Sequence, residues 1–157
     1  MPCSEPSAAN DYLAGHIQLL RDSYRHYLGL DLVDGSLSPV AAARQIYEAP
    51  YVVVSHNAAV DPVFTYGNQT ALQLFEMTWS EFTQLPSRQS AEPPNREARD
   101  RLLAAVTSQG FISDYAGIRI SKGGRRFWIR NVTVWNLRDA EGQYAGQAAV
   151  YSDWTDV

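Results

Sequence analysis

The chain has 157 residues, of which 45% are hydrophobic, and this is enough for one domain with a proper core but too few for two. Its formal net charge of −4 argues against a protein that binds nucleic acid or anionic membranes by general electrostatic attraction. The sequence contains no basic start followed by an apolar run and no stretch of about 18 apolar residues, so neither export nor membrane spanning is predicted.

The single cysteine, Cys3, excludes an internal disulfide and a metal site made of several cysteines. A reducing, cytoplasmic setting fits this cysteine content best. Two Asn-x-Thr sequons, at Asn68 and Asn131, are interpreted as chance matches because glycosylation requires export.

The first part of the chain is predicted to be a helical extension. Apolar residues recur at spacings of three and four from Asn10 to Leu28, and Gly29 stands where a helix C-cap is expected. After a linker, Ser38 as N-cap and Pro39 at the first helical position open a short helix. We therefore divide the chain into an extension and linker, residues 1–45, and a main domain, residues 46–157.

The main domain is predicted to be an α+β fold. β-branched and aromatic runs bounded by turn residues predict five strands, at about 51–56, 63–67, 112–121, 125–138 and 143–152. Between the second and third strands, Asn68 and Ser80 are placed to cap short helices, and Asn95 opens a longer helix that ends at Gly110. Strands segregated from helices and joined by tight turns indicate a five-stranded antiparallel sheet with helices on one face.

Two segments of the main domain resemble PAS domains. The first is "YGNQTALQLFEMTWSEF", in which a strand ends at an Asn that begins a helix. The second is the ending "GGRRFWIRNVTVWNLRDAEGQYAGQAAVYSDWTDV", with a glycine turn, a Phe-Trp strand, Arg-Asp-x-x-Gly and a strand closing in Asp-x-Thr. More narrowly, "APYVVVSH", "LPSRQSAEPPNREAR" and "GFISDYAGIRISKGGRRF" are similar to the MEKHLA family, a PAS-related group, over residues 45–155.

The resemblance implies a PAS-like sheet that cradles a helical layer, and a role in sensing or protein interaction. Members of the family occur as modules attached to plant transcription factors and as small stand-alone proteins. This sequence resembles the stand-alone form, and we therefore expect it to signal to a separate protein.

The resemblance also bears on cofactors. The flavin-binding branch of PAS proteins needs a reactive thiol just before an arginine, whereas Ser87 precedes Arg88 here. Tyr151 stands where that branch carries a flavin-facing glutamine, so the pattern disfavours flavin. Haem would require an inward histidine, and His16, His26 and His56 are better interpreted as satisfied or exposed side chains. The cofactor, if there is one, stays unidentified.

The period of two along residues 125–138 predicts a ligand site. If Phe127 and Ile129 face the helices, then Asn131, Thr133 and Trp135 share their face. Buried polar side chains need partners, which either the protein or a ligand can supply. The predicted ligand-binding residues on this face of the last three strands are Tyr115, Arg119, Asn131, Thr133, Trp135, Gln147 and Tyr151. An inward Arg119 would favour a carboxylate or phosphate ligand.

A purely structural reading of these residues stays open. Arg119 can pair with Glu92 or Asp114, Asn131 can cap a backbone edge, and Trp135 can fill the core. No small molecule is then required in the layer between sheet and helices.

The opposite face of the same strand is predicted to be an interface. Trp128, Val132 and Val134 form an apolar stripe on a face that water should otherwise contact. Either the N-terminal helix or the sheet of a second copy in a homodimer is expected to cover it.

The sequence favours a non-enzymatic protein. It contains no glycine-rich phosphate loop, no nucleophile in a recognisable setting and no spacing typical of a metal site. The alternative is a small hydrolase or isomerase that uses a pocket carboxylate, for which Asp61 and Asp114 are the candidates.

Overall fold

The computed structural model describes residues 4–157, so the prediction concerning Cys3 lies outside the described residues. The strands are β1 (Val52–His56), β2 (Phe64–Gly67), β3 (Phe111–Ile120), β4 (Arg126–Arg138), β5 (Tyr144–Tyr151) and β6 (Asp153–Asp156). The helices are η1 (Ala8–Leu13), α1 (Ala14–Leu28), α2 (Pro39–Tyr47), α3 (Gln69–Phe75), α4 (Trp79–Phe82), η2 (Ser87–Ser90) and α5 (Pro93–Gln109).

The sheet is antiparallel, and its strands lie in the order β2-β1-β5-β4-β3. A short sixth strand, β6, follows β5 directly and pairs with the first half of β4, from Phe127 opposite Asp156 to Arg130 opposite Asp153. The predicted α+β class and antiparallel arrangement are confirmed. The strand predicted at about 143–152 corresponds to β5, and the separate short strand β6 after Ser152 was not among the five predicted.

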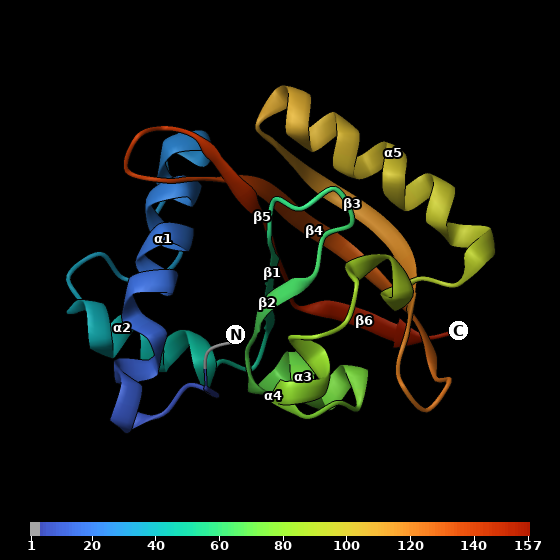
Figure 1. Ribbon diagram of the computed structural model, residues 1–157, viewed down its shortest axis with the longest axis horizontal. Helices are drawn as coiled ribbons and strands as arrows, with labels where there is room; N and C mark the ends of the chain where they lie inside the picture. Colours follow the sequence, from blue (N-terminus) through green and yellow to red (C-terminus); the bar gives the residue numbers. More distant parts are fainter. Residues whose placement is uncertain (1–3) are drawn as a thin grey trace.

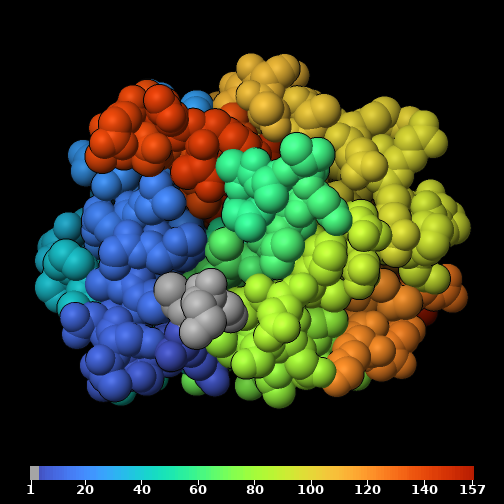
Figure 2. Space-filling model, in the orientation of Figure 1, coloured from blue at the N-terminus to red at the C-terminus, as the bar shows by residue number. Residues whose placement is uncertain are grey.

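Helices cover both faces of this sheet. Figure 1 shows α1 and α2 on one side and α5 on the other. α3 lies on the α5 side, where Phe75 packs against Phe127 of β4. The space-filling view shows the described chain as one packed body, with the N-terminal helices in blue and α5 in yellow at opposite flanks (Figure 2).

Local signals in the sequence account for most helix ends. Gly29 ends α1 with a φ of 69°, and the Ser38 hydroxyl caps α2 ahead of Pro39. Asn68 caps α3, and its buried carboxamide also bonds the backbone of β1. Two predicted helix starts are wrong. Thr78, not Ser80, caps α4 through a capping box with Glu81, and α5 begins at Pro93 after Glu92 rather than at Asn95.

A bulge in β4 overturns the predicted alternation of side chains. Asn131 has a φ of 53°, a left-handed conformation, and the register with β3 is irregular beside it. The extra residue moves Val132 and Val134 onto the face of Ile129, where all three line a cavity. The prediction that Trp135 lies on that face is wrong, because the alternation starts afresh at the bulge.

Trp135 instead anchors α1 to the other face of the sheet. Its indole Nε1–H donates to the backbone carbonyl of Leu20 at 3.2 Å, and the ring of Tyr24 meets it edge-on at a centroid distance of 4.9 Å. Trp135 and Leu20 are both completely buried. The N-terminal helix of the same chain thus covers this part of the sheet, which was one of the two coverings predicted.

The division of the chain at residue 45 stays a prediction. The helix α1, which lies before that boundary, packs on the sheet of the main domain.

In residues 4–157, no helix is both long and apolar enough to cross a membrane.

Candidate functional site

A cavity of about 70 Å³ lies between the sheet and the helical layer of α5 and η2. Its apolar wall comes mainly from Phe64, Phe75, Leu102, Ile129, Val132 and Val134. Its polar groups include His56, Ser87, Arg99, Tyr115, Arg119 and Gln147. Ligand sites are commonly built in this way, from an apolar wall with a few convergent polar groups.

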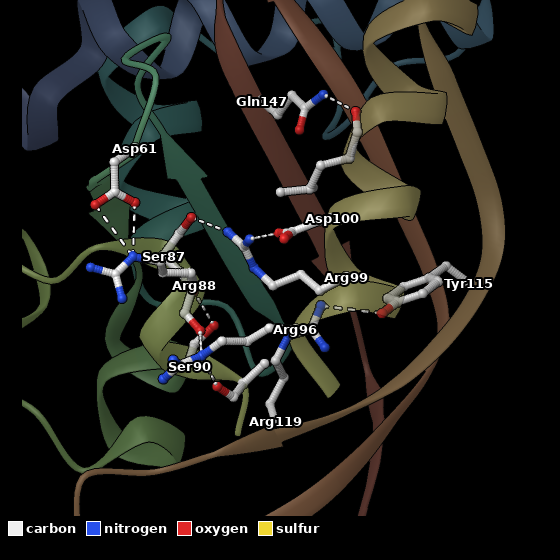
Figure 3. A network of polar contacts seen from close by, with 12 residues as sticks. Asp61, Ser87, Arg88, Ser90, Arg96, Arg99, Asp100, Tyr115, Arg119 and Gln147 are labelled. Carbon is white, nitrogen blue, oxygen red and sulfur yellow. Dashed lines mark hydrogen bonds and ion pairs between the residues drawn. The ribbon is translucent and has the colours of Figure 1, made fainter. Parts of the chain in front are cut away.

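Arg99 reaches the cavity from α5 and is 5% exposed. Its guanidinium donates to the Ser87 hydroxyl and, at 3.0 Å, to a carboxylate oxygen of Asp100 (Figure 3). Burial lowers the pKa of Arg99, and the positive charge of Arg119 lowers it further. The Asp100 carboxylate is exposed and does not line the cavity, although it pairs with Arg99.

Arg119 lies on β3, across the cavity from α5. Its guanidinium donates to the carbonyl of Ile118 at 2.9 Å and to the hydroxyl of Tyr115 at 3.3 Å, and it lies over the Tyr115 ring (Figure 3). Neither carboxylate considered from the sequence pairs with it: Glu92 meets Arg126 at 3.6 Å instead. Within residues 4–157 no carboxylate lies within 4 Å of the Arg119 guanidinium.

His56 and Gln147 lie opposite each other on β1 and β5, and both are more than nine-tenths buried. The Gln147 amide N–H groups donate to Leu103, Thr107 and Asn136. Its carbonyl oxygen makes no hydrogen bond to the described chain. The same is true of His56 Nε2. Burial lowers the pKa of His56, the hydrogen bond to the Asn57 carbonyl opposes this, and the positive charge of Arg99 lowers the pKa further.

The model for the MEKHLA domain matches residues 14–156 of this chain, from the first turn of α1 to the end of β6. The chain belongs to the MEKHLA domain family. Homeobox-leucine zipper protein ATHB-14 of Arabidopsis thaliana is 24% identical over 145 residues, which are 90% of this chain and 17% of that protein. The chain therefore spans about a sixth of the length of the curated relatives it matches.

Solved structures show the fold to which the MEKHLA domain is similar. The PAS domain of a protein from Colwellia psychrerythraea superposes with a TM-score of 0.61 at 16% identity, covering 73% of this chain and 92% of that one. A light-oxygen-voltage domain, the mechanism of which was addressed with a flavin analogue, superposes with a TM-score of 0.59 at 20% identity, covering 73% and 83%. The PAS-like fold expected from the sequence is confirmed.

The MEKHLA domain brings four of the predicted ligand-binding residues to the cavity: Tyr115, Arg119, Gln147 and Tyr151. Three others do not line it. Asn131 is exposed at the bulge and donates to Asp153, Thr133 lies opposite Val150, and Trp135 packs under α1. That these four bind a ligand stays a prediction.

Because of the bulge, the three residues of the predicted interface lie on different faces of the sheet. Val132 is 1% exposed and Val134 is 5% exposed, and both face the cavity, so their predicted place on the outer face is wrong. Trp128 keeps its predicted orientation and is 38% exposed, with the guanidinium of Arg130 6.0 Å from its ring centroid.

The polar cavity residues that the sequence interpretation missed are Ser55, His56, Ser87, Ser90 and Arg99. Arg99 could have been found, because it precedes Leu102 and Val106 at spacings of three and seven, on the buried face of α5. His56 gave no comparable signal, since a histidine at a strand end is usually exposed.

The residues of this cavity do not fit a flavin. Its volume of about 70 Å³ is well below the ~300–1,000 Å³ of pockets that enclose drug-sized ligands. The Ser87 hydroxyl, at the position where the resemblance places the reactive thiol, is bonded to Arg99. Among residues 4–157 there is also no group of three or more His, Cys, Asp or Glu residues that could hold a metal ion.

Proposed function

We propose that this MEKHLA domain is a non-enzymatic sensory or protein-interaction module that binds a small molecule between sheet and helices and signals to a separate protein. The observation that carries the proposal is the set of buried polar groups at the cavity whose hydrogen-bonding capacity the described chain does not fill. The buried His56 Nε2 and Gln147 carbonyl oxygen have no partner, and beside them the half-buried Arg119 has no carboxylate. Such groups are costly to bury unless something binds them.

A route from the cavity to the outside runs through the last two strands. Tyr151 lines the cavity at the end of β5, and its ring packs edge-on against Trp154 of β6 at a centroid distance of 6.0 Å. A ligand that displaces Tyr151 would therefore bias the pairing of β6 with β4. β6 is the element through which we propose that a partner senses the ligand.

The two carboxylates considered for an enzymatic function lie outside the cavity. Asp61 is exposed and accepts the Nε–H of Arg88 on its two carboxylate oxygens, and Asp114 is exposed on β3. Neither carboxylate lines the cavity, and no other Asp or Glu among the described residues does. The cavity therefore lacks the pocket carboxylate on which the enzymatic alternative depended.

The test is native mass spectrometry of the protein purified without added ligand, followed by denaturation and analysis of what is released. The proposal predicts a stoichiometric small molecule, or one that binds from a small-metabolite library, without turnover. A cavity that retains nothing and binds nothing from the library would contradict it, as would catalysed conversion of a bound compound.

A further inference from the structure

We infer that the cavity takes a small monocarboxylic acid with an apolar body and a hydrogen-bond donor, such as a hydroxyl group, away from the carboxylate. This inference rests on the proposed function, because it assigns a chemical class to the same site. It follows from three features of the cavity: its charge, its apolar wall and its two unpaired acceptors.

The positive charge of the cavity favours an anionic ligand. Two guanidinium groups, from Arg99 and Arg119, line it, while among the described residues no Asp or Glu does. Each guanidinium donates two hydrogen bonds within the protein, which leaves further N–H donors on both. Their mutual repulsion contributes to the lowered pKa of Arg99. A carboxylate between or beside them relieves this repulsion and can accept charge-assisted hydrogen bonds.

The balance of charge favours a single negative charge. Arg99 and Arg119 bring two positive charges, and Asp100, bonded to Arg99 at 3.0 Å, brings one negative charge. The sum is one positive charge at the guanidinium end. A monocarboxylate completes this sum, whereas a phosphate dianion would leave buried negative charge against an apolar wall.

The apolar wall beyond the two arginines indicates that the rest of the ligand is apolar. Phe64, Phe75, Leu102 and Ile129 contribute apolar surface. A body of short aliphatic or aromatic character fills this space, and the volume of about 70 Å³ excludes a nucleotide-sized molecule.

Two unpaired acceptors, His56 Nε2 and the Gln147 carbonyl oxygen, indicate that the ligand carries a hydrogen-bond donor. The Nδ1 of His56 lies 2.9 Å from the carbonyl oxygen of Asn57, which can only accept, so in the neutral ring Nδ1 carries the proton and Nε2 is an acceptor. The Gln147 amide group donates to three oxygens, which fixes its carbonyl oxygen as the other acceptor. Two unpaired acceptors on facing strands require a donor, which a ligand hydroxyl supplies.

Isothermal titration calorimetry at pH 7 tests the inference with matched probes. The hydroxy acids are 4-hydroxybenzoate, 6-hydroxyhexanoate and 3-hydroxybutanoate. Each is compared with its deoxy acid (benzoate, hexanoate or butanoate), and 4-hydroxybenzoate also with 4-hydroxybenzamide. At least one hydroxy acid is expected to bind about tenfold or more tightly than its deoxy acid, and 4-hydroxybenzamide is expected not to bind detectably.

Variants locate the binding. Arg119→Met keeps an unbranched apolar stem but removes the guanidinium and its charge, and it is expected to weaken binding of the best hydroxy acid about tenfold or more. Arg88→Met removes the same charge from the helical side outside the cavity, where Arg88 pairs with Asp61, and is expected to leave affinity within about twofold. Thermal unfolding of both variants verifies that each is folded.

Two results would overturn the inference. One is that no hydroxy acid binds, or none binds better than its deoxy acid; the other is equal weakening by Arg119→Met and Arg88→Met. If the molecule released on denaturation is a neutral or cationic compound, the carboxylate assignment is wrong and the proposed sensory function stands. If nothing is released and no library compound binds, the proposed function fails too.

Discussion

Gly146 occupies a position in β5 that no other residue can take without a shift of the backbone. Its φ is 125°, and a Cβ built there would lie 2.1 Å from the backbone carbonyl oxygen of His56. This close approach sets the spacing of β1 and β5 beside the cavity residue Gln147.

Gly146→Ala is therefore expected to lower the free energy of unfolding by about 2–4 kcal/mol, because backbone atoms must separate to admit the methyl group. Urea unfolding followed by tryptophan fluorescence measures it. The control is Gly15→Ala in α1, where no atom lies within 4 Å of the added Cβ and helix propensity predicts a gain of about 0.5–1 kcal/mol. Equal stability of the two variants would contradict the close approach.

Asn131 is the residue at which inference from sequence failed for the site. Asn tolerates a left-handed φ better than most residues, but nothing in "WIRNVTVW" requires one, and unbroken alternation explained the pattern equally well. The position of a bulge depends on pairing across the sheet, here with β3 and with the β5–β6 junction. Residues before the bulge, such as Phe127 and Ile129, were placed correctly, and Trp135 after it was not.

At the scale of elements, the helix ends that depend on a single capping residue were predicted from the sequence. Ser38, Asn68 and Gly29 mark helix ends in the sequence because each satisfies or relieves a specific backbone group there. The sequence did not determine which surface α1 packs against, since its amphipathic pattern fits a partner subunit as well as the same chain. In the structure α1 packs against Trp135 of its own chain.

Leu20→Ala is expected to lower the free energy of unfolding by about 2–5 kcal/mol, because Leu20 is completely buried between α1 and the sheet. Leu30→Ala, just beyond α1 and 60% exposed, is the control and should stay within about 0.5 kcal/mol of the parent. Chemical denaturation gives both values. A Leu20→Ala variant as stable as the control would mean that α1 adds little to the fold.

A titratable group also holds α1 on the sheet. The His16 ring nitrogen Nε2 lies 2.9 Å from the Ser55 hydroxyl, and the imidazole packs near the ring of Tyr66 at 5.8 Å. Burial lowers the pKa of His16 from 6.5 to about 4. The unfolded chain thus binds this proton more readily than the folded one, so stability is full above pH 6.5 and falls as the pH drops toward 4.

His16→Gln keeps a polar partner for Ser55 but does not titrate. The variant is expected to lose less stability than the parent between pH 6.5 and 4, by on the order of 2 kcal/mol. Some pH dependence should remain, because burial also lowers the pKa of His56. Urea midpoints across this range measure the effect, with His26→Gln at an exposed position as the control. Parallel pH profiles for the parent and His16→Gln would contradict the account.

At the scale of the molecule, the two faces of the sheet have different roles. One face carries the cavity under α5, and the other carries α1 over Trp135 and leaves the end around Trp128 open. The resemblance gave the overall fold because the order of several phrases along the chain is specific. It could not give the ligand, which depends on the side chains that line this cavity.

We propose self-association through the open end of the outer face, with Trp128 at its centre. Trp128→Ser is expected to shift a homodimer toward monomer, because buried tryptophans carry much of the energy of an interface. Analytical ultracentrifugation measures the change, with Tyr144→Ser, another exposed aromatic at 42%, as the control. A parent protein that stays monomeric at high concentration would rule out this dimer.

The central claim is that the cavity between β3, β5 and α5 is a ligand site with arginines at one end. The most direct measurement is a two-dimensional NMR spectrum of the arginine Nε–Hε groups, assigned with Arg99→Lys and Arg119→Lys, during titration with the best-binding hydroxy acid. The account predicts that the Arg99 and Arg119 signals shift together while that of Arg44, at the surface of α2, stays in place. Shifts confined to exposed arginines, with Arg99 and Arg119 unmoved, would contradict it.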